Sequence, residues 1–121
     1  MTWDEFYKKW IDSDHASEII PHLPQLETMG SEEQVAEVIA DLGDDDKTAG
    51  DHLLRQALDA GLTFTGENLA WIEGCCSEEL WLQAVHTSAG HFTTADLDEL
   101  QRTYDELTES YERYQERKNR R

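Results

Sequence analysis

The chain of 121 residues is long enough for one domain, and its 38% hydrophobic content, with four Trp, four Tyr and three Phe, argues against a disordered acidic tail. Its 27 acidic and 10 basic side chains give a net charge of −17, which repels nucleic acid and anionic membranes and attracts basic protein surfaces. No apolar stretch approaches the ~20 residues that span a bilayer, and the amino terminus lacks the apolar core of a signal peptide, so we predict a cytoplasmic location and no membrane contact.

The charge is distributed unevenly along the chain. Residues 1–110 contain 25 acidic and five basic side chains, a net charge of −20. The last eleven residues contain five basic and two acidic side chains, which reverses the sign. The sequence therefore predicts a single domain, 1–121, with an acidic body, a basic tail and a protein partner that has a basic surface.

Residues 1–30 are predicted to form an amino-terminal cap on the rest of the domain. Thr2 and Glu5 have the spacing of a capping box, in which both side chains satisfy backbone N–H groups at a helix start. A short chain needs its large aromatic side chains in the core, so the aromatic face of this first helix should cover one end of a helical stack. The residues of that face are Trp3, Phe6, Tyr7 and Trp10.

Residues 31–60 and 61–89 each have the pattern of a helical hairpin. Ser31 and Gln34 predict a second capping box, and the Gly43–Asp46 run separates the two helices of the first hairpin. Ser77, followed by two Glu residues, predicts the start of the last helix of the second hairpin. Two more tryptophans recur among the apolar residues of this second hairpin, so we expect both in the core; they are Trp71 and Trp81.

Two similar turns indicate an internal repeat. The stretch Ala60–Leu69 matches Ala89–Leu97 with one residue deleted, and the helices before these turns stand 28 residues apart. Gly61 and Gly90 follow helical runs in these turns, where a left-handed backbone is expected. A period of 28 to 31 residues is typical of a helix–turn–helix unit that buries its apolar face by stacking on its neighbours. We predict an all-α fold of about six or seven helices, either a short α-solenoid-like stack or a plain helical bundle.

Residues 90–121 are predicted to form a long closing helix with a basic tail, and Thr93 and Asp96 have the spacing of a capping box, or a close variant of one, at its start. Its apolar and aromatic positions follow spacings of three and four, a seam wide enough for one partner helix, at Leu97, Leu100, Tyr104, Leu107, Tyr111 and Tyr114. Tyr and Arg are enriched in interface hot spots, so docking of a partner or a homodimer through this helix is one interpretation. The candidate residues are Tyr104, Tyr111, Tyr114, Arg113 and Arg117. In the other interpretation, the basic residues only complement the helix dipole.

Three short segments together resemble a known group of proteins. They are the opening MTWDEFYKKW, the Ala-Gly-x-x-Phe-Thr turn that begins at Ala60, and the Phe-Thr-x-x-x-Leu turn that begins at Phe92. This pattern resembles small acidic helical proteins encoded on phages and conjugative elements of Gram-positive gut bacteria, over most of residues 1–100. The resemblance implies no activity and no site residues. It implies a context, because small acidic proteins of mobile elements include inhibitors of host defence nucleases, some of which mimic nucleic acid.

The residue types that most often carry chemistry form no recognisable site. The Asp44–Asp46 run is the densest acidic cluster, but an EF-hand loop beginning there would need Gly and Glu where the chain has Ala49 and Arg55. Cys75 and Cys76 are adjacent and lack zinc-ligand spacing, so they read as small buried hydrophobic residues in a reducing compartment. The five histidines are scattered, without an HExxH motif or an i, i+4 pair: His15, His22, His52, His86 and His91. We therefore expect no enzyme, no metal and no cofactor.

Two functions remain open. The first is an acidic module that occupies the nucleic-acid-binding cleft of another protein, with carboxylates in the place of phosphates. The second is a repeat scaffold or adaptor that binds a protein through an apolar groove or its closing helix, with acidity serving solubility. The first predicts steep salt dependence of binding, and the second predicts weak salt dependence. The candidate acids for the first function lie on loops and outer helix faces: Glu32, Glu33, Glu37, Asp41, Asp44, Asp45, Asp46, Asp51, Glu67, Glu73, Glu78 and Glu79.

Overall fold

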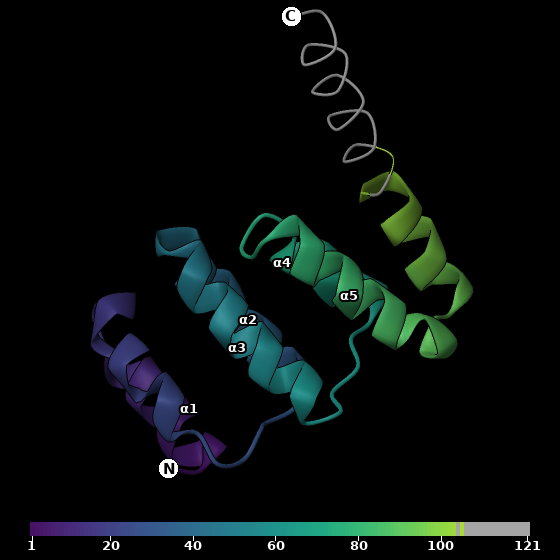
Figure 1. Ribbon diagram of the computed structural model, residues 1–121. Coiled ribbons are helices and arrows are strands. Elements are labelled where there is room, and N and C mark those ends of the chain that lie inside the picture. Colours follow the sequence, from purple (N-terminus) through teal and green to yellow (C-terminus); the bar gives the residue numbers. More distant parts are fainter. Residues whose placement is uncertain (104, 106–121) are drawn as a thin grey trace, which may run out of the picture.

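The computed structural model describes residues 1–103 and 105, and every regular element in this part of the chain is helical, which confirms the all-α prediction. A further helix begins at Thr94 and continues through residue 103, and the rest of the predicted closing helix lies outside the described residues. None of the described helices is both long and apolar enough to cross a membrane. In chain order, the elements before the helix from Thr94 are α1 (Trp3–Asp12), η1 (Ala16–Glu18), η2 (Ile20–Gln25), α2 (Glu32–Asp45), α3 (Lys47–Asp59), α4 (Gly66–Ile72), α5 (Glu78–Ser88) and η3 (Ala89–His91) (Figure 1).

Two helix starts carry the predicted reciprocal caps. At α1, the Thr2 hydroxyl accepts from the backbone N–H of Glu5, and the Glu5 carboxylate accepts from the backbone N–H of Thr2. At the helix from Thr94, the hydroxyl of Thr93 accepts from the N–H of Asp96, whose carboxylate accepts from the N–H of Thr93 at 2.9 Å. These bonds lower the pKa values of both carboxyl groups, because each accepts from a backbone N–H.

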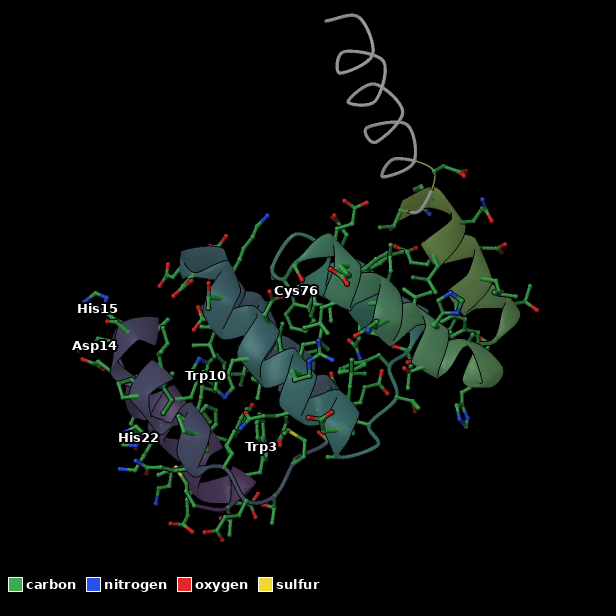
Figure 2. All side chains as sticks on the ribbon, in the orientation of Figure 1. Trp3, Trp10, Asp14, His15, His22 and Cys76 are labelled. Atoms are coloured by element: carbon green, nitrogen blue, oxygen red, sulfur yellow. The ribbon has the colours of Figure 1, made fainter. Side chains whose placement is uncertain are left out.

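The start of α2 differs from the prediction. The hydroxyl of Ser31 caps the helix by accepting from the N–H of Gln34, but the Gln34 side chain does not complete a capping box. Its Oε1 accepts instead from the indole Nε1 of Trp3 at 2.9 Å. A distant aromatic donor therefore competes successfully with the local cap, and the bond holds α1 against α2. Figure 2 shows Trp3 and Trp10 in the space between α1 and the hairpin that follows.

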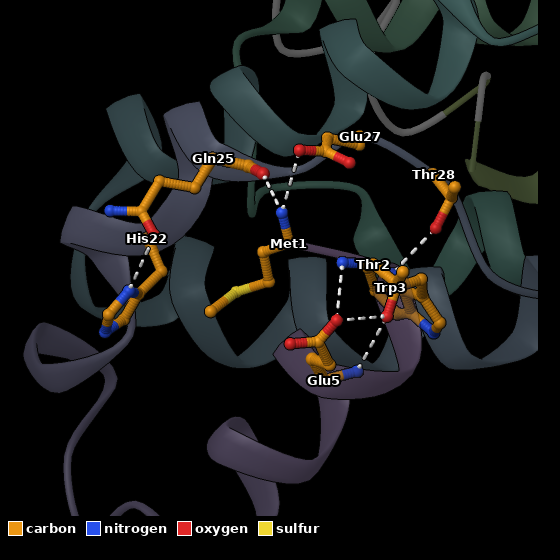
Figure 3. A network of polar contacts seen from close by, with 8 residues as sticks. All are labelled: Met1, Thr2, Trp3, Glu5, His22, Gln25, Glu27 and Thr28. Atoms are coloured by element: carbon orange, nitrogen blue, oxygen red, sulfur yellow. Dashed lines mark hydrogen bonds and ion pairs between the residues drawn. The ribbon is translucent and has the colours of Figure 1, made fainter.

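The amino terminus is anchored on the segment that precedes α2 (Figure 3). The amino group of Met1 donates to the carbonyl of Gln25 at 2.9 Å and lies 3.3 Å from a carboxylate oxygen of Glu27. The backbone N–H of Trp3 donates to the Thr28 hydroxyl at 2.8 Å. Trp3 and Phe6 are buried while Tyr7 and Trp10 are partly buried, so the first helix covers one side of α2 with its aromatic face.

Successive helices stack with a sequence offset close to the predicted repeat. One row consists of α1, α2, α4 and the helix from Thr94, and the second row consists of η2, α3 and α5. Groups at nearly equivalent repeat positions contact each other along each row, so the described chain forms a short stack of helical hairpins. The hydrogen bonds that span this offset join Trp3 to Gln34 and Trp10 to Asp41, each 31 residues apart, Tyr7 to Glu37 and Gly66 to Asp96, each 30 apart, and Arg55 to Gln83, 28 apart.

Two glycines let the hairpins approach closely. A Cβ on Gly43 would lie 1.9 Å from the carbonyl oxygen of Cys75, and a Cβ on Gly50 would lie 2.1 Å from the same oxygen. Both glycines are buried, one in the last turn of α2 and the other in the first turn of α3. The α2–α3 turn and the α4–α5 turn therefore lie together at one end of the stack.

The two tryptophans of the second hairpin have different environments. Trp81 is buried and its indole Nε1 donates to the carbonyl of Leu69 at 2.7 Å, as expected for a core residue. The prediction for Trp71 is wrong, because 48% of this side chain is exposed. The short helix α4 buries Leu69 and Ile72, which are three residues apart, and the position next to Ile72 falls outside that face.

The repeated turns are also not identical. Gly61 has the predicted left-handed backbone, with φ of +84°. The same prediction for Gly90 is wrong, because α5 continues directly into η3 and no reversal of φ is needed there. Gly74, between α4 and α5, has φ of +84° and makes the turn that closes the second hairpin.

Candidate protein-interaction surface

Most of the candidate acids lie in solvent. Eight of the twelve are exposed, namely Glu33, Asp41, Asp44, Asp45, Asp46, Glu67, Glu78 and Glu79, and four are partly buried, namely Glu32, Glu37, Asp51 and Glu73. Their exposure agrees with a solvated acidic surface. Their positions along the helices divide them into groups rather than into one continuous patch.

Seven of these acids gather where the two hairpin turns meet. The α2–α3 turn and the α4–α5 turn touch at Gly43 and Cys75, and the acids before and after these turns share that end of the molecule. We refer to them as the turn-end cluster: Asp44, Asp45, Asp46, Asp51, Glu73, Glu78 and Glu79. Glu32, Glu33 and Glu67 lie at the other end, at the starts of α2 and α4. The two groups are separated by the length of α2, about 20 Å for its 14 residues.

The two cysteines lie close to acids of the turn-end cluster, whose negative charge affects their pKa values. Cys76 is buried and Cys75 is partly buried, which confirms that the pair is packed rather than exposed. Burial, reinforced by Asp51 and other nearby charges, raises the pKa of Cys76 to about 12. Burial, with Asp44 and Glu73 nearby, also raises the pKa of Cys75. Both thiols are therefore held in the protonated, unreactive form at neutral pH.

Two of the predicted partner-binding acids make hydrogen bonds within the fold. Glu32 accepts hydrogen bonds from the backbone N–H of Thr65 and from the side-chain amide of Asn68, so it joins α2 to the start of α4. Asp51 accepts from the backbone N–H of Ser77 at 2.6 Å, so it joins α3 to the start of α5. Each carboxylate accepts from a backbone N–H that has no partner within its own helix. Spacing in the sequence does not show which distant side chain meets such a donor.

The acidic surface has little internal compensation. Within residues 1–103 and 105, two ion pairs are found, between the Met1 amino group and Glu27 and between Arg102 and Glu99. Arg55 donates to the Gln83 side chain rather than to a carboxylate. Most of the negative charge in this part of the chain is therefore not neutralised by a basic group of the same chain, and it acts on solvent ions and on an approaching partner.

A shallow groove crosses three helices of the first row. It has a volume of about 640 Å³ and is lined by the end of α1, the middle of α2 and the end of α4. Two of its apolar side chains are unusually exposed, Ile11 at 60% and Trp71 at 48%. Its lining residues are Trp10, Ile11, Ser13, Asp14, Glu37, Ala40, Asp41 and Trp71.

Two of the three carboxylates of the groove are held in position by aromatic residues of α1. The hydroxyl of Tyr7 donates to Oε1 of Glu37 at 3.3 Å, and burial together with this carboxylate raises the pKa of Tyr7. The indole Nε1 of Trp10 donates to Oδ2 of Asp41 at 2.7 Å. The rings of Tyr7 and Trp10 pack with centroids 5.5 Å apart, so both donors belong to one aromatic group. Each carboxylate uses one oxygen in these bonds.

The groove between α3 and α5 has a different character. Two adjoining hollows of about 460 and 450 Å³ lie there, and Arg55 and Glu79 line both. His52 lines one hollow and His86 lines the other. Because side chains of both signs line this side, it offers no uniform electrostatic signal to a partner.

The predicted seam of the closing helix is only partly within the described residues. Leu100 is buried as expected, but Leu97 is 55% exposed, so the seam does not begin where it was predicted to begin. Leu97 is in the first turn of the helix, and Leu100 is the position of this seam that joins the hydrophobic core. The candidates Tyr104, Tyr111, Arg113, Tyr114 and Arg117 lie outside the described residues.

Sequence reasoning missed Ile11 and Trp71 as candidate contact residues. One signal could have found the groove, since Trp10, Asp41 and Trp71 are spaced by about one repeat and such positions align in a stack. In the part of the chain that the structure describes, no three or more His, Cys, Asp or Glu side chains are placed to hold a metal ion. Comparisons with protein families, with curated proteins and with solved structures found no match to this chain.

Proposed function

We propose that this protein is a non-enzymatic interaction module of the cytoplasm that binds a basic surface on a partner protein. The observation that carries the proposal is the uncompensated acidity of the body. Residues 1–110 have a net charge of −20, and the described part contains only the two ion pairs given above. Such a field raises the rate of encounter with a basic protein and disfavours contact with nucleic acid itself.

The specific form that we propose is occupation of a nucleic-acid-binding cleft. The turn-end cluster offers several exposed carboxylates on two adjacent turns, which supports contact with Arg and Lys side chains that otherwise bind phosphates. The resemblance to acidic proteins of mobile elements suggests a defence nuclease of the host as the class of partner. Inhibition would then follow from competition for the cleft, without any chemistry on the nuclease.

A second candidate function is supported by the groove on α1, α2 and α4. Exposed apolar side chains, Ile11 and Trp71, support a scaffold or adaptor that binds a protein mainly through apolar contacts. Under this candidate function the acidity serves solubility, and binding would depend weakly on salt.

The test begins with capture of partners from a lysate of the native host at low salt, followed by elution with increasing sodium chloride and competition with duplex DNA. Two variants with equal charge then locate the contact on the captured partner. The turn-end variant carries D44N, D45N, E78Q and E79Q, at exposed positions that accept no described side-chain hydrogen bond. The control variant carries D4N, D12N, D59N and D98N, at exposed positions elsewhere.

The expected outcome is a partner that elutes at moderate salt, is displaced by DNA, and binds the turn-end variant at least about tenfold more weakly than the control variant. Equal losses in the two variants would mean that only total charge matters. Salt-resistant capture that DNA does not displace would contradict the nucleic-acid-mimic form and leave the scaffold function.

A further inference from the structure

The groove on the first row is formed by repeat-equivalent positions of three stacked helices. Trp10 and Asp41 are 31 residues apart and are joined directly by a hydrogen bond. Trp71 lies one further repeat along, on α4, and lines the same groove. A stack of helical repeats commonly presents its binding surface in this way, with one or two side chains from each repeat.

The chemistry of the groove is both apolar and acidic. Ile11 and Trp71 supply exposed apolar surface, and Asp14, Glu37 and Asp41 supply three carboxyl groups beside it. No Lys or Arg is among the described residues that line it. An aromatic face next to a carboxylate suits a guanidinium or ammonium group, because the ring attracts the cation while the carboxylate pairs with it.

The positions of two of the three carboxylates, Glu37 and Asp41, are set before any partner arrives. The hydroxyl of Tyr7 holds one oxygen of Glu37, and the indole of Trp10 holds one oxygen of Asp41. The second oxygen of each carboxylate takes no hydrogen bond from the described residues, and so each can still accept from a donor in the groove. Side chains that are already ordered lose less conformational entropy on binding.

We propose that this groove binds an amphipathic basic segment of a partner protein. Apolar side chains of the segment pack on Ile11 and Trp71, and its Arg or Lys side chains pair with Asp14, Glu37 and Asp41. This inference rests on the proposed binding of a basic partner and adds a second contact site, away from the turn-end cluster. It also combines the two candidate functions, because one amphipathic basic segment can make both the apolar contacts of a scaffold and the charge contacts of an acidic module.

The test uses a defined probe, a fluorescein-labelled amphipathic peptide of Leu and Arg with capped ends, and fluorescence anisotropy at low salt. A counterpart with Glu in the place of Arg measures the need for positive charge. The full chain is titrated as wild type and as W71A, and as the double variant E37Q with D41N, in which both side chains keep an acceptor oxygen. The matched charge control is D59N with D98N, which removes the same charge at exposed positions outside both the groove and the turn-end cluster.

The expected result is binding of the Arg peptide and not of the Glu peptide. W71A should weaken binding about tenfold or more, since an exposed Trp at the centre of a contact is a typical hot spot. The E37Q and D41N double variant should weaken it more than the control pair does. In an NMR titration, the indole N–H signals of Trp10 and Trp71 should shift while those of the buried Trp3 and Trp81 stay in place.

Unchanged affinity of W71A, with the fold intact by thermal unfolding, would overturn the groove as the binding site. So would equal losses in the groove pair and the control pair, because they would show attraction by total charge only. These outcomes are distinct from failure of the proposed function. If the turn-end variant still loses its natural partner while W71A keeps it, the acidic module stands and only the groove assignment fails.

Discussion

The indole N–H of Trp10 donates a 2.7 Å hydrogen bond to Oδ2 of Asp41, and this bond ties the end of α1 to α2 at the edge of the groove. Asp41 was a candidate for partner contact on sequence grounds, and the structure gives it a role within the fold as well. The bond orients both a ring and a carboxylate toward the same surface. It therefore links the stability of the amino-terminal cap to the shape of the groove.

Removing the acceptor of this bond should loosen α1. D41A leaves the indole N–H without its partner and is expected to lower the free energy of unfolding by about 1 kcal/mol, the usual value of a hydrogen bond. D41N keeps an acceptor oxygen and should lose less. Urea unfolding of the two variants checks this, and equal stability of D41A and wild type would show that the bond contributes nothing to the cap.

The two tryptophans of the second hairpin should respond oppositely to truncation. W81A removes a buried ring and is expected to cost about 3–5 kcal/mol, because a cavity remains and the carbonyl of Leu69 loses its donor. W71A removes an exposed ring and should change stability by less than about 1 kcal/mol. Thermal unfolding of both variants tests this contrast. A large loss in W71A would mean that this ring is part of the core.

Close contact at Gly43 predicts a sharp response to one added methyl group. In G43A the new Cβ would overlap the carbonyl of Cys75, which is backbone and cannot rotate away, so we expect a cost of about 1–3 kcal/mol or more. G90A is the control, because nothing lies within 4 Å of its Cβ and its φ is not positive. It should stabilise by about 0.4–1 kcal/mol through the unfolded chain. The two measurements should therefore differ in sign.

Burial of the Cys76 thiol predicts a loss of stability at alkaline pH. Its pKa is raised from 9.0 to about 12 in the folded protein, so the contribution of the neutral thiol is complete below pH 9 and is lost as pH rises toward 12. Under reducing conditions, the free energy of unfolding should fall more steeply between these pH values in wild type than in C76A. Identical slopes would show that the thiol ionises equally well in both states.

The features of the fold that depend on local chemistry were predictable from sequence. The reciprocal caps at Thr2 and Thr93 are seen as predicted, since a hydroxyl and a carboxylate three residues apart need only a helix start to meet. The stacking offset was also predictable, because the matching turns at Phe64 and Phe92 mark the repeat. At Ser31, the hydroxyl cap was predictable but the reciprocal Gln34 cap was not. The Gln34 side chain accepts instead from Trp3, which is 31 residues away in the sequence.

The candidate site was harder to predict than the fold. Periodicity in the seven residues of α4 cannot show which of two faces meets the neighbouring helices, so the exposure of Trp71 required the structure. The roles of Glu32 and Asp51 depend on backbone donors of other helices, which sequence spacing does not place. Among 27 acids, only the packing of the hairpins distinguishes structural carboxylates from those that face solvent.

Binding of a basic partner by the acidic body is best measured through the salt dependence of the affinity for the captured partner. The dissociation constant is measured over a series of sodium chloride concentrations for wild type and for the turn-end variant D44N, D45N, E78Q and E79Q. If the acidic body binds a basic partner, a logarithmic plot for wild type should show a steep, linear loss of affinity with salt, and the plot for the variant should have a clearly shallower slope. A flat plot for wild type, or the same slope for both proteins, would contradict this proposal.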